Sequence, residues 1–157
     1  MSEELFELTK NHTLPVALSL LPAKFDTPQA RAMLLAIAGQ ETDFKHRVQV
    51  SGPARGLWQF EPNTVRLVLA HPVVGPMAAD AASRLRYTAA PVANYYAVAD
   101  NDALACVFAR LLLWPDPHPL PGEHDADAGW ECYRRVWKPG KPRPDAWAAN
   151  WRRAWQG

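Results

Sequence analysis

One acidic side chain, Glu41, follows an apolar helical pattern and could carry acid–base chemistry. If the helix that starts near Pro28 continues this far, Glu41 lies one turn after Ile37 and two turns after Leu34, on the apolar face. Burial against apolar side chains disfavours the charged form of a carboxyl group, so its pKa rises. Such a group suits the general acid that cleaves a glycosidic bond near neutral pH. The alternative is an acidic residue that leaves a fraying helix end and points to water.

A second motif, Gly52–Gln59, has the sequence Gly-Pro-Ala-Arg-Gly-Leu-Trp-Gln. Two glycines and a proline disfavour a helix here, so we expect a loop. Gln59 ends the motif with an amide that donates and accepts hydrogen bonds at once, which suits an acetamido group or a sugar hydroxyl. Trp58 could offer a face for sugar stacking, although an aromatic residue inside a Gly-Leu-Trp-Gln-Phe run is more often part of the core.

Together the two motifs resemble those of lytic transglycosylases and goose-type lysozymes. Glu41–Phe44 (Glu-Thr-Asp-Phe) is similar to the Glu-Ser-x-Phe motif of that family. Arg55–Gln59 is similar to its Arg-Gly-Leu-Met-Gln motif, and the two motifs have the family's separation. Glu61–Thr64 resembles the family's Met-Pro-x-Thr helix start. The resemblance extends from Leu34 to about Val68.

The resemblance implies a mainly α, lysozyme-like fold and cleavage of peptidoglycan between N-acetylmuramic acid and N-acetylglucosamine. It implies that Glu41 is the catalytic acid and then the base, that Thr42 helps to hold Glu41, and that Gln59 lies near the reacting sugar. Phe44 would pack at the floor of the cleft. Lysozymes of this group add water, whereas the transglycosylases release a 1,6-anhydro sugar, and the sequence leaves this choice open.

The chain departs from the family pattern after Val68. Family members carry a later Ala-Tyr-Asn-Ala-Gly segment whose tyrosine reaches the catalytic glutamate, but the comparable segment here, Ala103–Trp114, has no tyrosine. Tyr95 and Tyr96 could supply this hydroxyl from a neighbouring helix, or they could pack with their hydroxyls at the surface. The predicted substrate-binding set is therefore Thr42, Trp58, Gln59, Tyr95 and Tyr96.

No second carboxylate is expected to face the substrate beside Glu41. Asp43 would lie about 200° further round a helix. Asp100 and Asp102 lie at a helix start, where capping explains them. One glutamate suffices if the 2-acetamido group of the substrate attacks its own anomeric carbon.

Prolines and capping residues divide the chain into helices that must position these side chains. Asp26 or Thr27 is an N-cap candidate, and Pro28 suits the first turn that follows. The alternation in Arg47–Val50 suggests a short extended segment. The remaining helices are expected from Pro62 to about Ala70, from Pro76 to about Tyr87, over Ala103–Trp114 with Asn101 and Asp102 as its cap, over Gly129–Trp137 and over Asp145–Trp155. The predicted class is mainly α with little or no β-structure.

A single domain is expected over residues 1–157, since 157 residues and a 48% hydrophobic fraction suit one core. Residues 26–112 would form the catalytic core, and a segment rich in proline and tryptophan, 113–157, would pack on it. Trp147, Trp151 and Trp155 recur every four residues and would dock the last helix, with Arg152 and Arg153 pointing to water. Alternatively, these aromatic and basic residues could bind single-stranded nucleic acid or grip a glycan strand.

Composition excludes several other classes. The net charge of +1 gives no general attraction to nucleic acid or membrane. Cys106 and Cys132 make no disulfide framework, and no metal-ligand set or phosphate-binding glycine loop is present, so we expect no cofactor. No apolar run approaches the roughly 20 residues that span a bilayer. The N-terminus does not resemble a secretory signal, so we expect synthesis in the cytoplasm without a signal peptide.

The leading hypothesis is a peptidoglycan muramidase whose partners are glycan strands. A small domain without a signal peptide and with such a C-terminal segment resembles bacteriophage or prophage proteins of this group, located in the virion or released to the cell wall. One alternative is a non-enzymatic virion or glycan-binding protein that keeps the fold. Another is a nucleic-acid-binding module, against which the neutral charge and the lack of a recognition-helix motif argue. The sequence predicts neither the host nor the oligomeric state.

Overall fold

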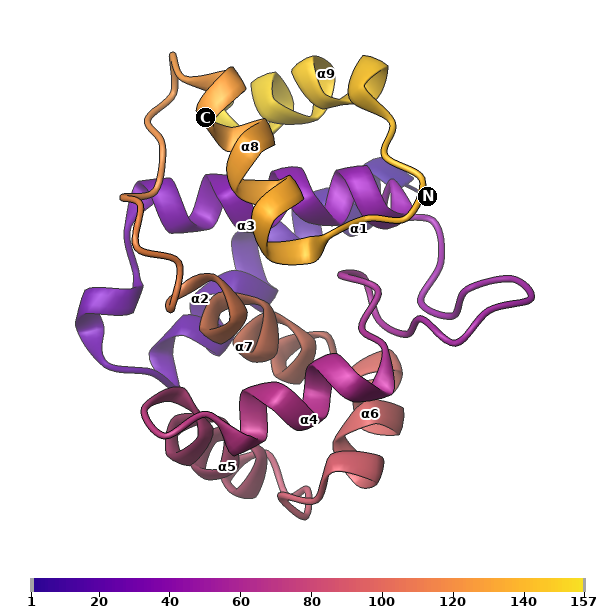
Figure 1. The fold of residues 1–157 in the computed structure, drawn as a ribbon, viewed down its shortest axis with the longest axis vertical. Coiled ribbons are helices and arrows are strands. Elements are labelled where there is room, and N and C mark those ends of the chain that lie inside the picture. The colour runs from indigo at the N-terminus through magenta and orange to yellow at the C-terminus, as the bar shows by residue number, and fades with distance from the viewer. Residues whose placement is uncertain (1, 157) are drawn as a thin grey trace.

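Helix α3 (Pro28–Thr42) crosses the middle of the molecule, and the other helices surround it (Figure 1). The computed structural model describes residues 2–156. Nearly every side chain of α3 from Ala30 to Gln40 is buried, as is typical of a helix that is apolar on all sides. It contacts α9 (Pro144–Trp155), α7 (Asp102–Leu113) and the π-helical turn η1 (Thr9–Thr13).

Two groups of helices lie on opposite sides of α3 (Figure 1). On one side, α8 (Ala126–Trp137) packs against α9. On the other, α7 contacts α5 (Val74–Arg84) and α6 (Pro91–Asp100), and α4 (Pro62–Ala70) contacts all three. Buried residues of both groups belong to one hydrophobic core, so the prediction of a single, mainly α domain is confirmed.

The segment before α3 forms helices that the sequence analysis did not predict. Helix α1 (Ser2–Leu8) continues through η1 into α2 (Leu14–Ser19), and the short 3-10 helix η2 (Ala23–Phe25) precedes α3. The π-helical turn lies directly before Pro15, whose ring would clash with the Asn11 carbonyl in a regular α-helix. The turn thus lets one helical segment continue past a proline.

Helix starts follow the predicted caps closely. The Thr27 hydroxyl accepts a hydrogen bond from the Ala30 N–H at 3.0 Å, and the Asn101 side chain accepts one from the Leu104 N–H at 3.0 Å. Two helices start earlier than predicted: α5 begins at Val74 and α8 at Ala126.

The predicted extended segment at 47–50 forms no strand. The described residues contain only isolated β-bridges, Val48 with Arg55 and Arg55 with Phe60. No helix among residues 2–156 has the length and apolar character to cross a membrane.

The C-terminal segment is docked through its tryptophans. Trp147 and Trp151 are buried, and their indole N–H groups donate hydrogen bonds to the carbonyl oxygens of Ala126 (2.8 Å) and Glu123 (2.7 Å). Helix α9 also packs against α3, and two of the three tryptophans expected to dock it are buried, whereas Trp155 is only partly buried.

The expectation that both arginines of the last turn point to water is half right. Arg152 is exposed, but the Arg153 guanidinium lies over the Phe6 ring, 4.2 Å from its centroid. Cation–π attraction and the nearby Asp43 carboxylate, 3.8 Å away, explain why Arg153 folds back onto the domain.

Truncation of a buried tryptophan of α9 should destabilise the whole domain. Trp151→Ala is expected to lower the free energy of unfolding by about 3–5 kcal/mol, because it empties a buried indole site. Arg152→Ala, the exposed neighbour, should stay within about 0.5 kcal/mol of wild type. Chemical denaturation of both variants checks this, and a Trp151→Ala protein as stable as wild type would contradict the docking.

Candidate functional site

Glu41 lies in the last turn of α3, more buried than exposed. Burial raises the pKa of its carboxyl group to about 7, because desolvation penalises the charged form. Interaction with the Tyr133 hydroxyl and the positive charge of Arg143 lower this pKa and offset part of the rise. A carboxyl group with such a pKa can both donate and accept a proton near neutral pH.

Tyr133, on α8, is the tyrosine that the structure brings to Glu41. Its side chain is 2% exposed, its ring stacks on Trp147 with centroids 5.4 Å apart, and its hydroxyl interacts with the Glu41 carboxyl. Sequence reasoning missed it because the family resemblance ends before α8. The spacing of Trp130, Tyr133 and Trp137 places all three on one helix face, a signal that Tyr133 points inward.

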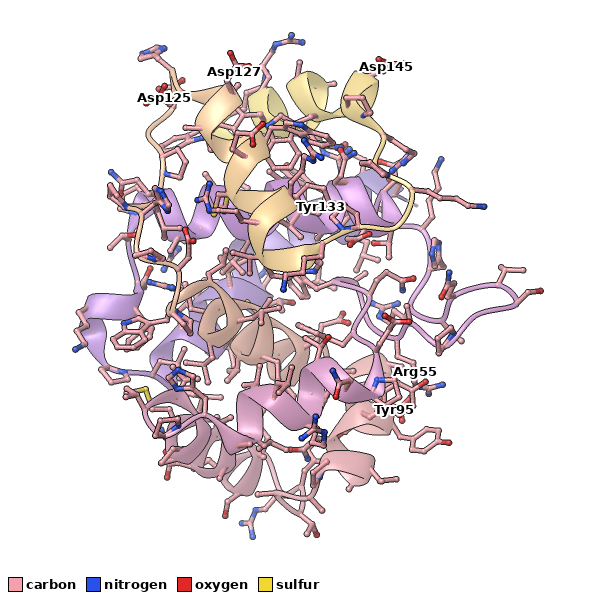
Figure 2. All side chains as sticks on the ribbon, viewed as in Figure 1. Arg55, Tyr95, Asp125, Asp127, Tyr133 and Asp145 are labelled. Atoms are coloured by element: carbon pink, nitrogen blue, oxygen red, sulfur yellow. The ribbon has the colours of Figure 1, made fainter. Side chains whose placement is uncertain are left out.

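Tyr95 and Tyr96, by contrast, lie away from Glu41. The Tyr95 hydroxyl donates a hydrogen bond to the Pro53 carbonyl oxygen at 2.5 Å, and Tyr96 is exposed. The Arg55 guanidinium lies 5.6 Å from the Tyr95 ring centroid and 4.9 Å from that of Tyr96. Figure 2 shows Tyr95 and Arg55 together at the lower right, apart from Tyr133. The two tyrosines therefore brace the loop that precedes α4 and do not reach Glu41.

That loop, residues 43–61, turns sharply several times between α3 and α4. Asp43, Phe44, Ser51 and Gln59 have positive φ angles of 50°, 55°, 57° and 55°, which cost a non-glycine residue about 1 kcal/mol or more each. Gly56 has a φ of 83°, and a Cβ there would lie 2.8 Å from the Val98 carbonyl oxygen, so only glycine fits. Such a backbone persists only where surrounding contacts hold it.

Buried hydrogen bonds supply those contacts. The Thr42 hydroxyl lies 3.1 Å from the carbonyl oxygens of both Ala38 and Leu57 and shares its hydrogen between them. The Trp58 indole N–H donates to the Leu34 carbonyl oxygen at 2.9 Å, and the Trp137 indole N–H donates to the Trp58 carbonyl oxygen at 2.9 Å. Both the body of α3 and the end of α8 therefore hold the loop.

This arrangement corrects the assignment of Thr42 and Trp58 to substrate binding. Both side chains are buried, Trp58 completely, so neither can touch a substrate in the cleft. Phe44 is also buried and packs edge-on against Phe6. Of the predicted substrate-binding set, Gln59 alone lines the cleft beside Glu41.

The cleft consists of two adjoining hollows of about 330 and 430 Å³, which share Glu41, Gln49 and Gln59. We call the first the mixed hollow, because apolar side chains such as Leu112, Val136 and Trp137 line it together with polar and charged ones. We call the second the basic hollow. Its other lining residues are Gln40, His46, Tyr133, Lys141 and Arg143. Glu41 thus lies where the two hollows meet.

Other acidic groups are placed differently. Asp43 pairs with Lys45 at 3.0 Å and lines neither hollow, in agreement with the expectation that it does not share a substrate with Glu41. Asp102 binds the Arg47 guanidinium through both carboxylate oxygens, at 2.7 and 2.8 Å. Glu61 is exposed and lines the mixed hollow. Within residues 2–156 no group of three or more His, Cys, Asp or Glu side chains could hold a metal ion.

No family model, curated protein or solved structure matches this chain. The assignment of a function therefore depends on the geometry of the site.

The raised pKa of Glu41 makes stability depend on pH. The folded state holds the proton more tightly than the unfolded chain, whose carboxyl has a pKa near 4.5, so stability falls as pH rises from about 4.5 to about 7. Glu41→Gln keeps the shape without a titratable group. We therefore compare the free energies of unfolding of the variant and wild type at about pH 4 and at about pH 8. The difference, variant minus wild type, should be more favourable to the variant at the higher pH by roughly 2 kcal/mol. Denaturation curves at both pH values test this, and a difference that does not change with pH would contradict the buried carboxyl.

The Tyr133 hydroxyl should lower the pKa of Glu41. Tyr133→Phe removes the hydroxyl that stabilises the Glu41 carboxylate but leaves the ring stacked on Trp147. The pKa of Glu41 should then rise by about 1 unit. Titration of the Glu41 side-chain carboxyl by carbon-detected NMR measures the shift, and an unchanged pKa would show that the hydroxyl does not act on Glu41.

Proposed function

We propose that this protein is a muramidase that cleaves the bond between N-acetylmuramic acid and N-acetylglucosamine in peptidoglycan, as a lysozyme or a lytic transglycosylase. The observation that carries the proposal is the Glu41 carboxyl, held at a pKa of about 7 where two hollows meet. A polymer that occupies both hollows would present the bond between them to this carboxyl. Gln59 lies on the same cleft, where its amide can bind a sugar acetamido group or hydroxyl.

In the first step, protonated Glu41 donates its proton to the glycosidic oxygen as the bond to the anomeric carbon breaks. The carbonyl oxygen of the 2-acetamido group attacks that carbon and forms a cyclic oxazolinium ion. The leaving sugar departs with the proton, and Glu41 is left as a carboxylate. Tyr133 and Arg143 then stabilise this negative charge.

In the second step, the Glu41 carboxylate removes a proton from the acceptor hydroxyl, which attacks the anomeric carbon and reopens the oxazolinium ring. The acceptor is water in a lysozyme and the 6-hydroxyl of the same sugar in a transglycosylase. Glu41 regains its proton, so the cycle closes. A pKa near 7 suits both steps, because neither protonation state is strongly disfavoured at neutral pH.

We also propose a phage or prophage origin and action on the cell wall, for which the support is the resemblance of the sequence. Nucleic-acid binding by the C-terminal segment has no comparable support, because Trp147 and Trp151 are buried and offer no face for base stacking.

Lysis of purified cell walls tests the proposal. Glu41→Gln should lower the lytic rate by about 10²-fold or more, because it removes proton transfer while it preserves shape. Glu131→Gln, an exposed carboxylate on α8 that lines neither hollow, is the matched control and should lyse like wild type. Equal lysis by Glu41→Gln and wild type would overturn the proposal.

Two further measurements resolve the mechanism. Glu61→Gln tests whether the second carboxylate of the cleft takes part, and a loss as large as that of Glu41→Gln would contradict a single-glutamate mechanism. Mass spectrometry of the released fragments distinguishes the two acceptors, since a 1,6-anhydro product is lighter than the hydrolysis product by one water.

A further inference from the structure

We propose that the basic hollow binds a carboxylate that the glycan carries beside the reacting bond, so that Lys141 and Arg143 select acidic glycans over neutral ones. This inference rests on the proposed function, since it names the part of the glycan that lies in one half of the cleft.

The two halves of the cleft differ in charge. The titratable side chains that line the basic hollow are Glu41, His46, Tyr133, Lys141 and Arg143. Glu41 is the one carboxyl among them, and it is neutral when it is ready to act as an acid. The hollow then has two fixed positive charges and no negative charge. The mixed hollow instead combines Lys138 with the opposite charge of Glu61.

The connection between α8 and α9 holds Arg143 beside Glu41, and Lys141 lies on the same connection. The Gln40 amide donates a hydrogen bond to the Arg143 carbonyl oxygen at 2.7 Å, and the Arg143 guanidinium donates one to the Gln40 carbonyl oxygen. Asn150 donates from its amide to the Gln40 side-chain oxygen at 2.9 Å, which fixes the orientation of Gln40. Arg143 is thus tied to the residue next to Glu41 in sequence.

Neither cation is paired with a carboxylate in a salt bridge. In the described part of the chain, no salt bridge joins Lys141 or Arg143 to an acidic side chain, in contrast to Arg47, which pairs with Asp102. Both residues are exposed and line the hollow, where the Lys141 ammonium and the guanidinium N–H groups of Arg143 that do not bond Gln40 can bind a ligand. An ammonium and a planar guanidinium that line one hollow can both donate hydrogen bonds to a carboxylate bound there.

Carboxylates reach this position on a glycan in two ways. One is an acidic ether substituent on the sugar itself, and the other is a peptide attached to that substituent. Both present the same chemistry to Lys141 and Arg143, so the experiment must distinguish them. A neutral aminoglycan has neither.

Binding to four glycans provides the test: intact peptidoglycan fragments, fragments stripped of peptides by an amidase, stripped fragments whose carboxyls are converted to neutral amides, and chitin oligomers. Dissociation constants are measured in the Glu41→Gln background, so that cleavage does not interfere. Lys141→Gln should weaken binding of the acidic glycans about threefold, and Lys141→Gln with Arg143→Gln about tenfold. Neither change should affect the amide-converted or chitin ligands. Arg134→Gln, an exposed cation on α8 that lines neither hollow, is the matched control.

The outcomes separate this inference from the proposed function. Charge-dependent binding that Lys141→Gln weakens and Lys141→Arg restores supports the inference, whether or not wild type lyses walls. Equal affinity for acidic and amide-converted glycans overturns it, even if lysis depends on Glu41. If stripped fragments still bind more tightly than amide-converted ones, the hollow binds the sugar carboxylate. If this difference disappears when the peptides are removed, the hollow binds a carboxylate of the peptide. If the double variant does not fold, the affinities of Lys141→Gln and wild type for the acidic glycans decide the question.

Discussion

The burial of one carboxyl group at the end of the central helix is the constraint on which the rest of the site depends. Glu41 has a pKa near 7 because α3 lies in the core and carries its last turn to the edge of the cleft. The helices on either side of α3 cover it, and the loop after it returns Gln59 to the same place. An exposed Glu41 would ionise well below neutral pH and lose its capacity to donate a proton.

Much of the fold could be predicted from local signals. Prolines and capping side chains such as Thr27 and Asn101 act within a few residues, so the starts of α3, α4, α7 and α9 follow from the sequence. The N-terminal helices could not be predicted in this way. Their course depends on a π-helical turn before Pro15, a deviation that only packing against the core stabilises.

The site was predictable only as far as it is local. The Glu41 motif and the Gln59 motif lie on adjacent segments, and the structure brings both residues to the cleft. Tyr133 lies on α8, which is far from Glu41 in the sequence, and no local pattern predicts that α8 packs beside the end of α3. Tyr133 was missed, whereas Thr42 and Trp58 were predicted as substrate-binding residues and do not line the cleft. Their residue types suit sugar binding, but the structure uses both to hold the loop, because a backbone with several positive φ angles needs buried hydrogen bonds.

The division of the site between the two ends of the sequence has a consequence for synthesis. Glu41 and Gln59 leave the ribosome early, whereas Tyr133, Lys141 and Arg143 follow only with the last helices. A nascent chain that lacks α8 and α9 leaves one side of α3 uncovered, and its Glu41 faces water rather than a desolvated cleft. Docking of α8 and α9 therefore contributes to the burial that raises the pKa of Glu41. Because α8 and α9 follow Glu41 in the sequence, the residues that complete its surroundings are synthesised after it.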